Sequence, residues 1–199
     1  MDEAASTHPG PAPGTWRASR SPAPTMKEIH EKARRIRVAI FDVDGVLTDG
    51  RLYFTDSGEE IKAFNSRDGH GMKMLAESGV EIAIITGRTS RCVELRARNL
   101  GIERVYQGIA DKSVAFAELL AAMKLAPEAA AYMGDDVVDL PVLSRCGLAL
   151  TVPDAPLFVK QHADYVAQAR AGHGAAREVC ELIMHAQGTL DARLRAYLA

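Results

Sequence analysis

Residues 37–45, RVAIFDVDG, join an apolar run to two aspartates and a glycine. The run is apolar without alternation, which predicts a strand buried on both faces of a parallel sheet. Because side chains alternate along an extended chain, Asp42 and Asp44 can point to the same side at the end of this strand. Gly45 allows the sharp turn that follows them. The segment therefore predicts a strand that brings two carboxylates to one edge of a sheet.

Short apolar runs alternate with helix-length segments over the rest of the chain. The expected strands cover residues 37–42, 81–85, 104–106, 130–133, 148–152 and 164–167. Helices are expected near residues 70–77, 89–99, 112–124, 137–145, 155–161 and 174–187, after a helix-like lead-in over residues 26–35. This alternation predicts an α/β fold with a doubly wound, Rossmann-like parallel sheet, whose ligands bind at the carboxyl ends of the strands.

Residues 50–64 interrupt the alternation directly after the first strand. Two extended runs, residues 51–55 and 59–64, flank an Asp-Ser-Gly turn at residues 56–58, which is typical of a β-hairpin. A hairpin at this place stands at the ligand-binding edge of the sheet, so we expect a flap or an assembly surface. It is too small to form a separate domain.

Composition limits the number of domains. The chain has 199 residues and a net charge of -2, and 18 of its first 25 residues are Pro, Ala, Gly, Ser or Thr. Such a stretch buries too little apolar surface to fold, so we expect residues 1–25 to be a disordered extension. Residues 26–187 are expected to form one domain, which leaves too little chain for a large cap domain, and residues 188–199 a C-terminal tail.

Two classes of protein are excluded, and a compartment is indicated. The chain has no run of basic residues that would suit the phosphate backbone of a nucleic acid. Its apolar runs are far shorter than the ~20 residues that cross a bilayer, and the N-terminus lacks the apolar region of a secretory signal. The cysteines, Cys92, Cys146 and Cys180, lack metal-binding spacing, which favours reduced thiols in a cytoplasmic protein.

Four polar motifs each follow an expected strand. They contribute, in chain order, Asp42 and Asp44, Thr86, Lys112, and Asp135 and Asp136. Carboxylates this close repel one another unless a cation or a shared proton intervenes, and oxygen ligands of this kind suit Mg²⁺ far better than zinc. A hydroxyl and an ammonium group suit the oxygens of a phosphoryl group. Each motif alone has a plainer explanation as a helix cap or a solvated residue, but their agreement at four strand ends favours one common site.

The order of these motifs resembles that of the haloacid dehalogenase superfamily of aspartate-nucleophile phosphatases. A closer resemblance, to the 3-deoxy-D-manno-octulosonate 8-phosphate phosphatase family, rests on five segments. These are residues 42–50 (DVDGVLTDG), 58–60 (GEE), 64–71 (FNSRDGHG), 85–88 (ITGR) and 134–141 (GDDVVDLP). The resemblance implies a capless phosphatase domain over residues 26–187. It also implies Mg²⁺-dependent hydrolysis of that sugar acid phosphate in lipopolysaccharide precursor synthesis, by a homotetramer assembled through the hairpins.

The resemblance implies a role for each motif residue. Asp42 would be the nucleophile that forms an aspartyl-phosphate. Asp44 would protonate the departing sugar hydroxyl and then accept a proton from the attacking water. Mg²⁺ would be bound by Asp42, by the main-chain carbonyl of Asp44 and by Asp135. Thr86 and Lys112 would bind the oxygens of the transferred phosphoryl group.

Further residues are implied around this centre. Asp136 and Asp139 would orient a metal-bound water or Lys112. A sugar acid carries a carboxylate as well as a phosphate, so a second group of cations makes chemical sense. The tail would reach a neighbouring subunit's active site, or would simply be a frayed end. The implied substrate-binding residues, besides Asp44, Thr86 and Lys112, are Asn65, Ser66, Arg67, Asp68, Gly69, Lys73, Arg88 and Arg96, of which Arg96 could equally belong to a solvated helix face.

Other functions fit parts of the same pattern. A phosphatase of a related sugar acid phosphate, such as a neuraminate-type 9-phosphate, or a broader phosphomonoesterase would use the same motifs. A phospho-receiver domain also combines an acidic cluster with Thr and Lys, but its acidic pair typically follows the first strand, whereas here the pair comes late. A non-catalytic relative is disfavoured because every motif residue is present. A substrate panel would separate the enzymatic alternatives.

Overall fold

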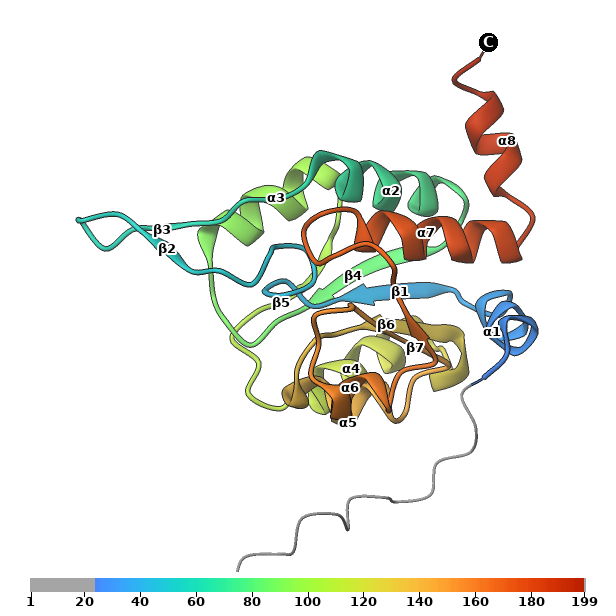
Figure 1. Ribbon diagram of the computed structural model, residues 1–199, viewed down its shortest axis with the longest axis horizontal. Coiled ribbons are helices and arrows are strands. Elements are labelled where there is room, and N and C mark those ends of the chain that lie inside the picture. Colours follow the sequence, from blue (N-terminus) through green and yellow to red (C-terminus); the bar gives the residue numbers. More distant parts are fainter. Residues whose placement is uncertain (1–23, 199) are drawn as a thin grey trace, which may run out of the picture.

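The computed structural model describes residues 24–198, and these residues form a six-stranded parallel sheet in the order β5-β4-β1-β6-β7-β8 (Figure 1). Every neighbouring pair in it runs parallel. The doubly wound α/β fold expected from the sequence is confirmed. The strands are β1 (Val38–Phe41), β4 (Glu81–Ile85), β5 (Arg104–Tyr106), β6 (Ala130–Met133), β7 (Leu148–Thr151) and β8 (Tyr165–Val166).

The strands that follow β1 in the sequence lie on both sides of it in the sheet. β4 and β5 lie on one side of β1, and β6, β7 and β8 lie on the other. Phe41, the last residue of β1, pairs with Ile84 on one side and with Met133 on the other. The residues that follow these three strands therefore emerge together at one edge, the switch point where doubly wound sheets bind ligands.

Helices cover both faces of the sheet. They are α1 (Met26–Ala33), α2 (Ser66–Glu77), α3 (Arg91–Leu100), α4 (Lys112–Met123), α5 (Leu140–Leu143), α6 (Leu157–Lys160), α7 (Ala175–Ala186) and α8 (Leu190–Arg195), with the 3-10 helices η1 (Pro127–Ala129) and η2 (Val137–Asp139). In Figure 1, α2, α3 and α7 lie on one face, and α4, α5 and α6 lie on the other. This arrangement explains why the central strands are apolar on both faces.

Capping groups move two helix boundaries away from those expected. α2 begins at Ser66 rather than near residue 70, because the side chain of Asn65 accepts a hydrogen bond from the backbone N–H of Arg67. The helix expected over residues 137–145 begins as the 3-10 turn η2, which Asp136 caps, and continues as the short α5. Both caps lie at the edge of the sheet where ligands bind.

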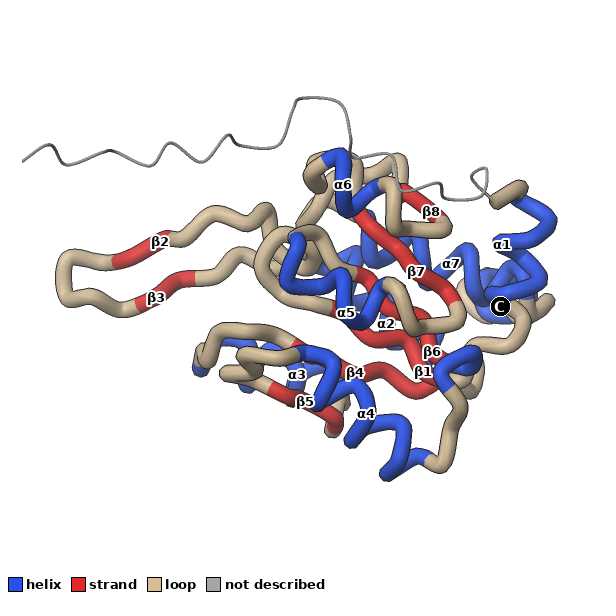
Figure 2. Tube along the Cα trace, turned by 90° about the horizontal axis from the view of Figure 1, so that it is seen from below, coloured by secondary structure: helices blue, strands red, loops and turns tan. Residues whose placement is uncertain are grey.

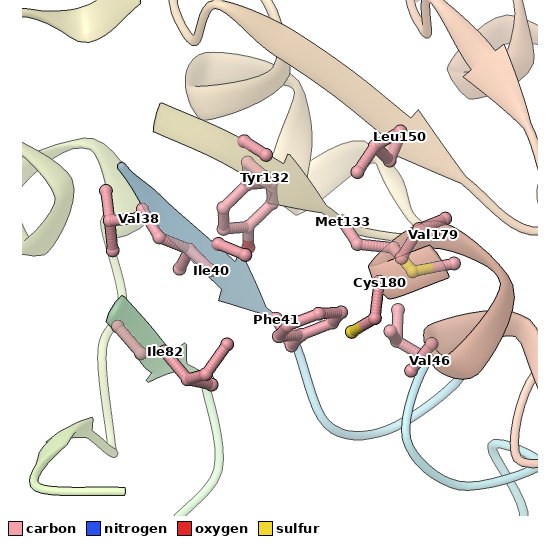
Figure 3. Close-up of a cluster of buried hydrophobic side chains, with 14 of the residues drawn as sticks. Val38, Ile40, Phe41, Val46, Ile82, Tyr132, Met133, Leu150, Val179 and Cys180 are labelled. Atoms are coloured by element: carbon pink, nitrogen blue, oxygen red, sulfur yellow. The ribbon is translucent and has the colours of Figure 1, made fainter. Parts of the chain in front are cut away.

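The core is built around β1, whose four residues are all buried. Figure 3 shows the ring of Phe41 pointing from β1 toward Cys180 of α7 and Val46 of the following loop. Tyr132 of β6 is the largest of the fully buried side chains. Each large apolar side chain buried in this way stabilises the fold by roughly 1.5–3 kcal/mol. The site at the end of β1 therefore follows a strand whose residues are all buried.

The insertion after β1 is a two-stranded hairpin, as expected. β2 (Tyr53–Phe54) pairs antiparallel with β3 (Glu60–Ile61), and the pair extends away from the sheet (Figure 2). Between β1 and β4 the described chain inserts only this hairpin and α2, so it contains no large cap domain. The hairpin exposes four apolar side chains, Leu52, Tyr53, Phe54 and Ile61.

The structure describes the C-terminal segment up to residue 198 and only the last two residues of the expected N-terminal extension. The extension expected over residues 1–25 lies outside the described residues, apart from its last two, of which Thr25 caps α1. The C-terminal segment contains α8, and Arg193 of this helix forms an ion pair with Glu77 of α2 at 3.1 Å. Among residues 24–198, no helix is both long and apolar enough to cross a lipid bilayer.

Candidate active site

Four charged side chains meet at the carboxyl edge of the sheet. Asp42 follows β1, Asp135 follows β6, Lys112 begins α4 and Asp139 ends η2. One carboxylate oxygen from each aspartate lies within 4.8 Å of the other two. We call these four residues the carboxylate cluster. The fold thus brings together the residues for which a metal and phosphate site was expected.

Lys112 is the counter-charge of the cluster. Its Nζ lies 2.6 Å from Asp42 Oδ2 and 2.6 Å from Asp139 Oδ1, and its side chain is only 3% exposed. Burial by itself would lower the pKa of Lys112, but the charges of Asp42 and Asp139 outweigh it and raise this pKa. Lys112 therefore remains an ammonium group, able to donate hydrogen bonds to anionic oxygens.

The carboxyl groups of Asp42 and Asp135 are poised to lose or bind a proton near neutral pH. Burial raises the pKa of Asp42 to about 6, with a further rise from Asp139 and an opposing effect of Lys112. Burial, followed by the charges of Asp42 and Asp139, raises the pKa of Asp135 to about 7. A bound cation would reverse both shifts, because it favours the charged form of each group.

Asp139 accepts four hydrogen bonds, whereas Asp42 accepts two, from Val43 N–H and Lys112 Nζ. Oδ1 of Asp139 accepts hydrogen bonds from Lys112 Nζ and from the Tyr132 hydroxyl, each at 2.6 Å, and Oδ2 accepts from the backbone N–H groups of Asp135 and Asp136 at 2.9 and 3.1 Å. Asp139 is thus suited to hold Lys112 and the loop in place. Asp136 is the N-cap of η2, the plainer role that the sequence also allowed.

Two glycines make the close packing of these carboxylates possible. Gly45 has a φ of +83°, and a Cβ at this position would overlap the carboxylate of Asp135. A Cβ at Gly134 would overlap the carboxyl group of Asp139. Glycine is therefore required at both positions by space, and at Gly45 by backbone conformation as well.

Asp44 lies beside the cluster in a second set of charges. Its carboxylate Oδ1 accepts from the ammonium group of Lys62, and Arg88 Nε lies 3.6 Å from its Oδ2. Glu60 of β3 contacts both cations, at 3.3 Å from Lys62 and 2.7 Å from Arg88. We call Asp44, Glu60, Lys62 and Arg88 the charge ring. Asp44 and Arg88 were expected site residues from the sequence, whereas Glu60, which lies in the quoted segment 58–60, and Lys62 had no expected role.

Comparison with known proteins identifies the family to which this arrangement belongs. A family model for haloacid dehalogenase-like hydrolases matches residues 102–179. The 3-deoxy-D-manno-octulosonate 8-phosphate phosphatase KdsC of Escherichia coli (strain K12) is 48% identical over 168 residues, which cover 84% of this chain and 89% of that protein. The chain belongs to the 3-deoxy-D-manno-octulosonate 8-phosphate phosphatase family. The resemblance drawn from its motifs is confirmed.

Solved structures of the family agree with the fold. The 3-deoxy-D-manno-octulosonate 8-phosphate phosphatase of Moraxella catarrhalis, in complex with magnesium ion, phosphate ion and a KDO molecule, superimposes with a TM-score of 0.86 at 40% identity, over 87% of this chain and 99% of that one. A probable YrbI family phosphatase of Pseudomonas syringae pv. phaseolica 1448a gives a TM-score of 0.86 at 52% identity, over 87% and 98%. The architecture is therefore that of the family over 87% of the chain.

The donor set of the cluster fits the magnesium ion of this family. Its donors are carboxylate oxygens, and the single ammonium group of Lys112 compensates three carboxylates. Hard oxygen donors with an excess of negative charge favour Mg²⁺. Because Asp139 already accepts four hydrogen bonds, Asp42 and Asp135 are the carboxylates better suited to hold the ion, with the main-chain carbonyl of Asp44 as the expected third ligand.

The other expected phosphate-binding group, Thr86, lies at the end of β4 and is buried. Its backbone N–H donates to Tyr106 O at 2.9 Å, and its backbone carbonyl accepts from Ile109 N–H at 3.2 Å. The residue is thereby fixed between β4 and the loop after β5. It stands at the same edge of the sheet as Asp42, because β4 pairs with β1.

Four of the expected substrate-binding residues lie together but are engaged by the protein itself. Arg96 of α3 donates to the backbone carbonyl of Asn65 at 3.0 Å and lies against Gly69, where a Cβ would overlap its guanidinium group. Asp68 is buried and accepts from the backbone N–H groups of Gly174 and Arg177 at 3.2 and 2.8 Å. This segment therefore connects α2 to α3 and to the beginning of α7.

The remaining three expected residues, Ser66, Arg67 and Lys73, lie on the exposed side of α2. Within residues 24–198, no hydrogen bond or ion pair joins their side chains to the carboxylate cluster. Their placement leaves them accessible to a bound substrate or to a neighbouring molecule. A role for them stays a prediction from the resemblance.

One buried residue of the site, Tyr132, had no signal in the sequence motifs. It lies in the middle of β6, and its hydroxyl reaches Asp139 at 2.6 Å. Burial, and then the charges of Asp139 and Asp42, raise the pKa of Tyr132 well above its ordinary value. The hydroxyl therefore stays protonated and donates. A large polar ring among the small apolar residues Ala130 and Ala131 was the only available hint.

Proposed function

We propose that this chain hydrolyses 3-deoxy-D-manno-octulosonate 8-phosphate, with Mg²⁺, to the free sugar acid and phosphate. One observation carries the proposal: Asp42 stands beside Asp135 at the switch point of the sheet, held by a buried lysine. Membership of the family supports the substrate, since the Escherichia coli relative is named for this activity and the Moraxella catarrhalis structure contains KDO, phosphate and magnesium. The enzyme class is that of a phosphoric monoester hydrolase, acting in lipopolysaccharide precursor synthesis.

The reaction has two steps. A carboxylate oxygen of Asp42 attacks phosphorus, the bond from phosphorus to the sugar oxygen breaks, and the sugar oxygen takes a proton from Asp44. Water then attacks the aspartyl-phosphate while Asp44 accepts its proton, which releases phosphate and restores Asp42. Mg²⁺, held by Asp42, Asp135 and the Asp44 carbonyl, offsets the negative charge that would otherwise repel the phosphate dianion. Lys112 and Thr86 bind the phosphoryl oxygens.

Substrate selection is assigned to the basic residues beside this centre. Arg88 stands next to Asp44 and is 46% exposed, so its guanidinium group is accessible to the carboxylate of a sugar acid. The other groups proposed to bind the substrate are Asn65, Ser66, Arg67, Asp68, Gly69, Lys73 and Arg96. A neuraminate-type 9-phosphate carries the same two anionic groups and is the alternative substrate.

We extend the proposal to the organisation of the molecule. Residues 26–187 form the phosphatase domain, and residues 188–199 form a C-terminal tail. The exposed apolar side chains of the hairpin, Leu52, Tyr53, Phe54 and Ile61, support assembly into a homotetramer through this element. Reduced cysteines support a cytoplasmic location.

Phosphate release from a panel of sugar phosphates, with Mg²⁺ or with a chelator, tests the proposed function. The expected result is the highest kcat/KM for 3-deoxy-D-manno-octulosonate 8-phosphate, dependent on Mg²⁺. Asp42→Asn is expected to lower kcat at least about 10⁴-fold, because the nucleophile is lost. Glu103→Gln, the same kind of change at the exposed amino end of β5, is the control and should retain activity. Higher kcat/KM for a neuraminate-type 9-phosphate would replace the proposed substrate.

A further inference from the structure

We propose that Lys62 is a positioning residue for Asp44: it holds one carboxylate oxygen so that the other faces the oxygen of the leaving sugar. The inference rests on the proposed function, in which Asp44 exchanges protons with substrate and water. Lys62 follows directly after β3, at the base of the hairpin. Its side chain is 2% exposed, and its ammonium group contacts Asp44 Oδ1. A buried lysine of this kind requires anionic partners, and it has two.

The charge ring gives Lys62 a defined position. Lys62 contacts Asp44 and Glu60, and Arg88 contacts Glu60 at 2.7 Å and approaches Asp44 at 3.6 Å. The ring has two positive and two negative members, so it is neutral and requires no further ion. Its members come from three places: the end of β1, the hairpin and the loop after β4. The hairpin is thereby joined to the group that transfers the proton.

The two oxygens of Asp44 are in different situations. Oδ1 accepts from Lys62, whereas Oδ2 is buried and has no hydrogen-bond partner among the described residues. Arg88 Nε, at 3.6 Å from Oδ2, is too far away to donate a hydrogen bond. A buried carboxylate oxygen without a donor is costly, which indicates that a ligand or a proton completes it. Oδ2 is therefore the oxygen available to the substrate.

This asymmetry has a chemical use in the first step. As the bond from phosphorus to the sugar oxygen breaks, its electron pair stays on the sugar oxygen, which takes the proton from Oδ2 of Asp44. The transfer needs Oδ2 within hydrogen-bond reach of that oxygen. Lys62 holds Oδ1 and so restricts rotation of the carboxyl group. A displacement of roughly 1 Å in such a group can cost about 100-fold in rate.

A comparison of two substrates tests the role of Lys62. An alcohol such as a sugar hydroxyl leaves only with a proton, whereas 4-nitrophenolate leaves without one, and kcat/KM reports the reaction up to this first step. In Lys62→Met, kcat/KM for 3-deoxy-D-manno-octulosonate 8-phosphate is expected to fall about 10- to 100-fold. The same variant should change kcat/KM for 4-nitrophenyl phosphate by less than about threefold.

Arg51→Met is the matched control. It removes one positive charge from the same hairpin, and Arg51 is 77% exposed and does not contact Asp44. Both substrates should be hydrolysed at the wild-type rate. An equal fall of kcat/KM for both substrates in Lys62→Met would assign Lys62 a structural role and overturn the proposal, as would no fall for either substrate.

A second variant covers the case in which Lys62→Met does not fold. Lys62→Gln keeps a donor for Oδ1, and the same selective loss with the sugar acid phosphate is expected, of smaller size. Failure of the proposed function is recognised separately, because the wild-type enzyme would then release no phosphate from this sugar acid phosphate. The comparison would in that case use another unactivated sugar phosphate that the wild-type enzyme hydrolyses.

Discussion

The carboxylate cluster and the charge ring lie side by side but are built in opposite ways. The cluster stands on rigid strand ends and contains three carboxylates for one ammonium group, so it requires a cation. The ring is neutral by itself, and two of its four members stand on an inserted hairpin. The sheet thus supplies the charge imbalance that suits metal and phosphate, whereas the hairpin supplies balanced charges beside Asp44.

The largest expected effect on stability comes from removing the counter-charge of the cluster. Lys112→Met leaves Asp42 and Asp139 buried without their cation, which is expected to destabilise the protein by about 3–5 kcal/mol and to lower kcat at least about 100-fold. Thermal unfolding and phosphate release measure the two effects. Lys62→Met serves as the comparison within the ring and should be less destabilising, since Arg88 remains beside Glu60. Equal destabilisation would remove the distinction between the two sites.

Stabilisation of the protein by Mg²⁺ is expected to depend on pH, because the ion binds at the carboxylate cluster. Because the pKa of Asp135 is raised to about 7, the metal-free folded protein binds protons more tightly than the unfolded chain. The contribution of Asp135 to stability therefore falls as pH rises from about 4 to about 7. Mg²⁺ binds the deprotonated groups, so the increase in Tm that saturating Mg²⁺ produces should be larger at pH 8 than at pH 6.

Two variants sharpen this measurement. Asp135→Asn removes a carboxylate suited to bind the ion and should abolish most of the Mg²⁺-dependent increase in Tm at either pH. Glu60→Gln changes the ring and should leave the increase unchanged. An increase in Tm of the same size at pH 6 and pH 8 in the wild-type protein would contradict the assignment of the raised pKa to the metal site.

The smallest expected effect on activity comes from removing the hydrogen bond that Tyr132 donates to the carboxylate cluster. Tyr132→Phe keeps the buried ring but removes the hydroxyl that donates to Asp139. Loss of a hydrogen bond to a charged group is expected to cost about 1.5–3 kcal/mol of stability. Because Lys112 and two backbone N–H groups still hold Asp139, kcat should fall only a few-fold, by about 2- to 5-fold. A loss of kcat as large as that of Lys112→Met would show that Tyr132 controls the position of Lys112.

Patterns that are local in sequence predicted most of the fold. The apolar runs predicted all six strands of the sheet, and the turn at residues 56–58 predicted the hairpin. Helix boundaries were less accurate where a side chain, such as Asn65, caps the helix earlier than the apolar pattern begins. Caps depend on one side chain and its local geometry, so periodicity does not reveal them.

The residues of the site also divide into those that local sequence patterns predicted and those that they did not. Asp42, Lys112 and Asp135 could be predicted because each follows an apolar strand, and parallel strands end at a common edge. Glu60 and Lys62 could not be predicted in this way, because they belong to the hairpin and do not follow a strand of the sheet. Their ion pairs depend on where the hairpin lies relative to Asp44. Tyr132 was hidden because a residue inside a strand gives no sign of which polar group its hydroxyl reaches.

The succession of strands and helices along the chain, the motifs at the strand ends and the family to which they point could all be predicted from the sequence. These features follow from side-chain periodicity and from chemistry carried by single residues. The tertiary structure alone decided which charges pair with which: Lys112 with Asp42 and Asp139, and Lys62 with Asp44. Ion pairs act over a few ångströms between residues distant in the chain, so only the packed arrangement of hairpin, sheet and helices could reveal them.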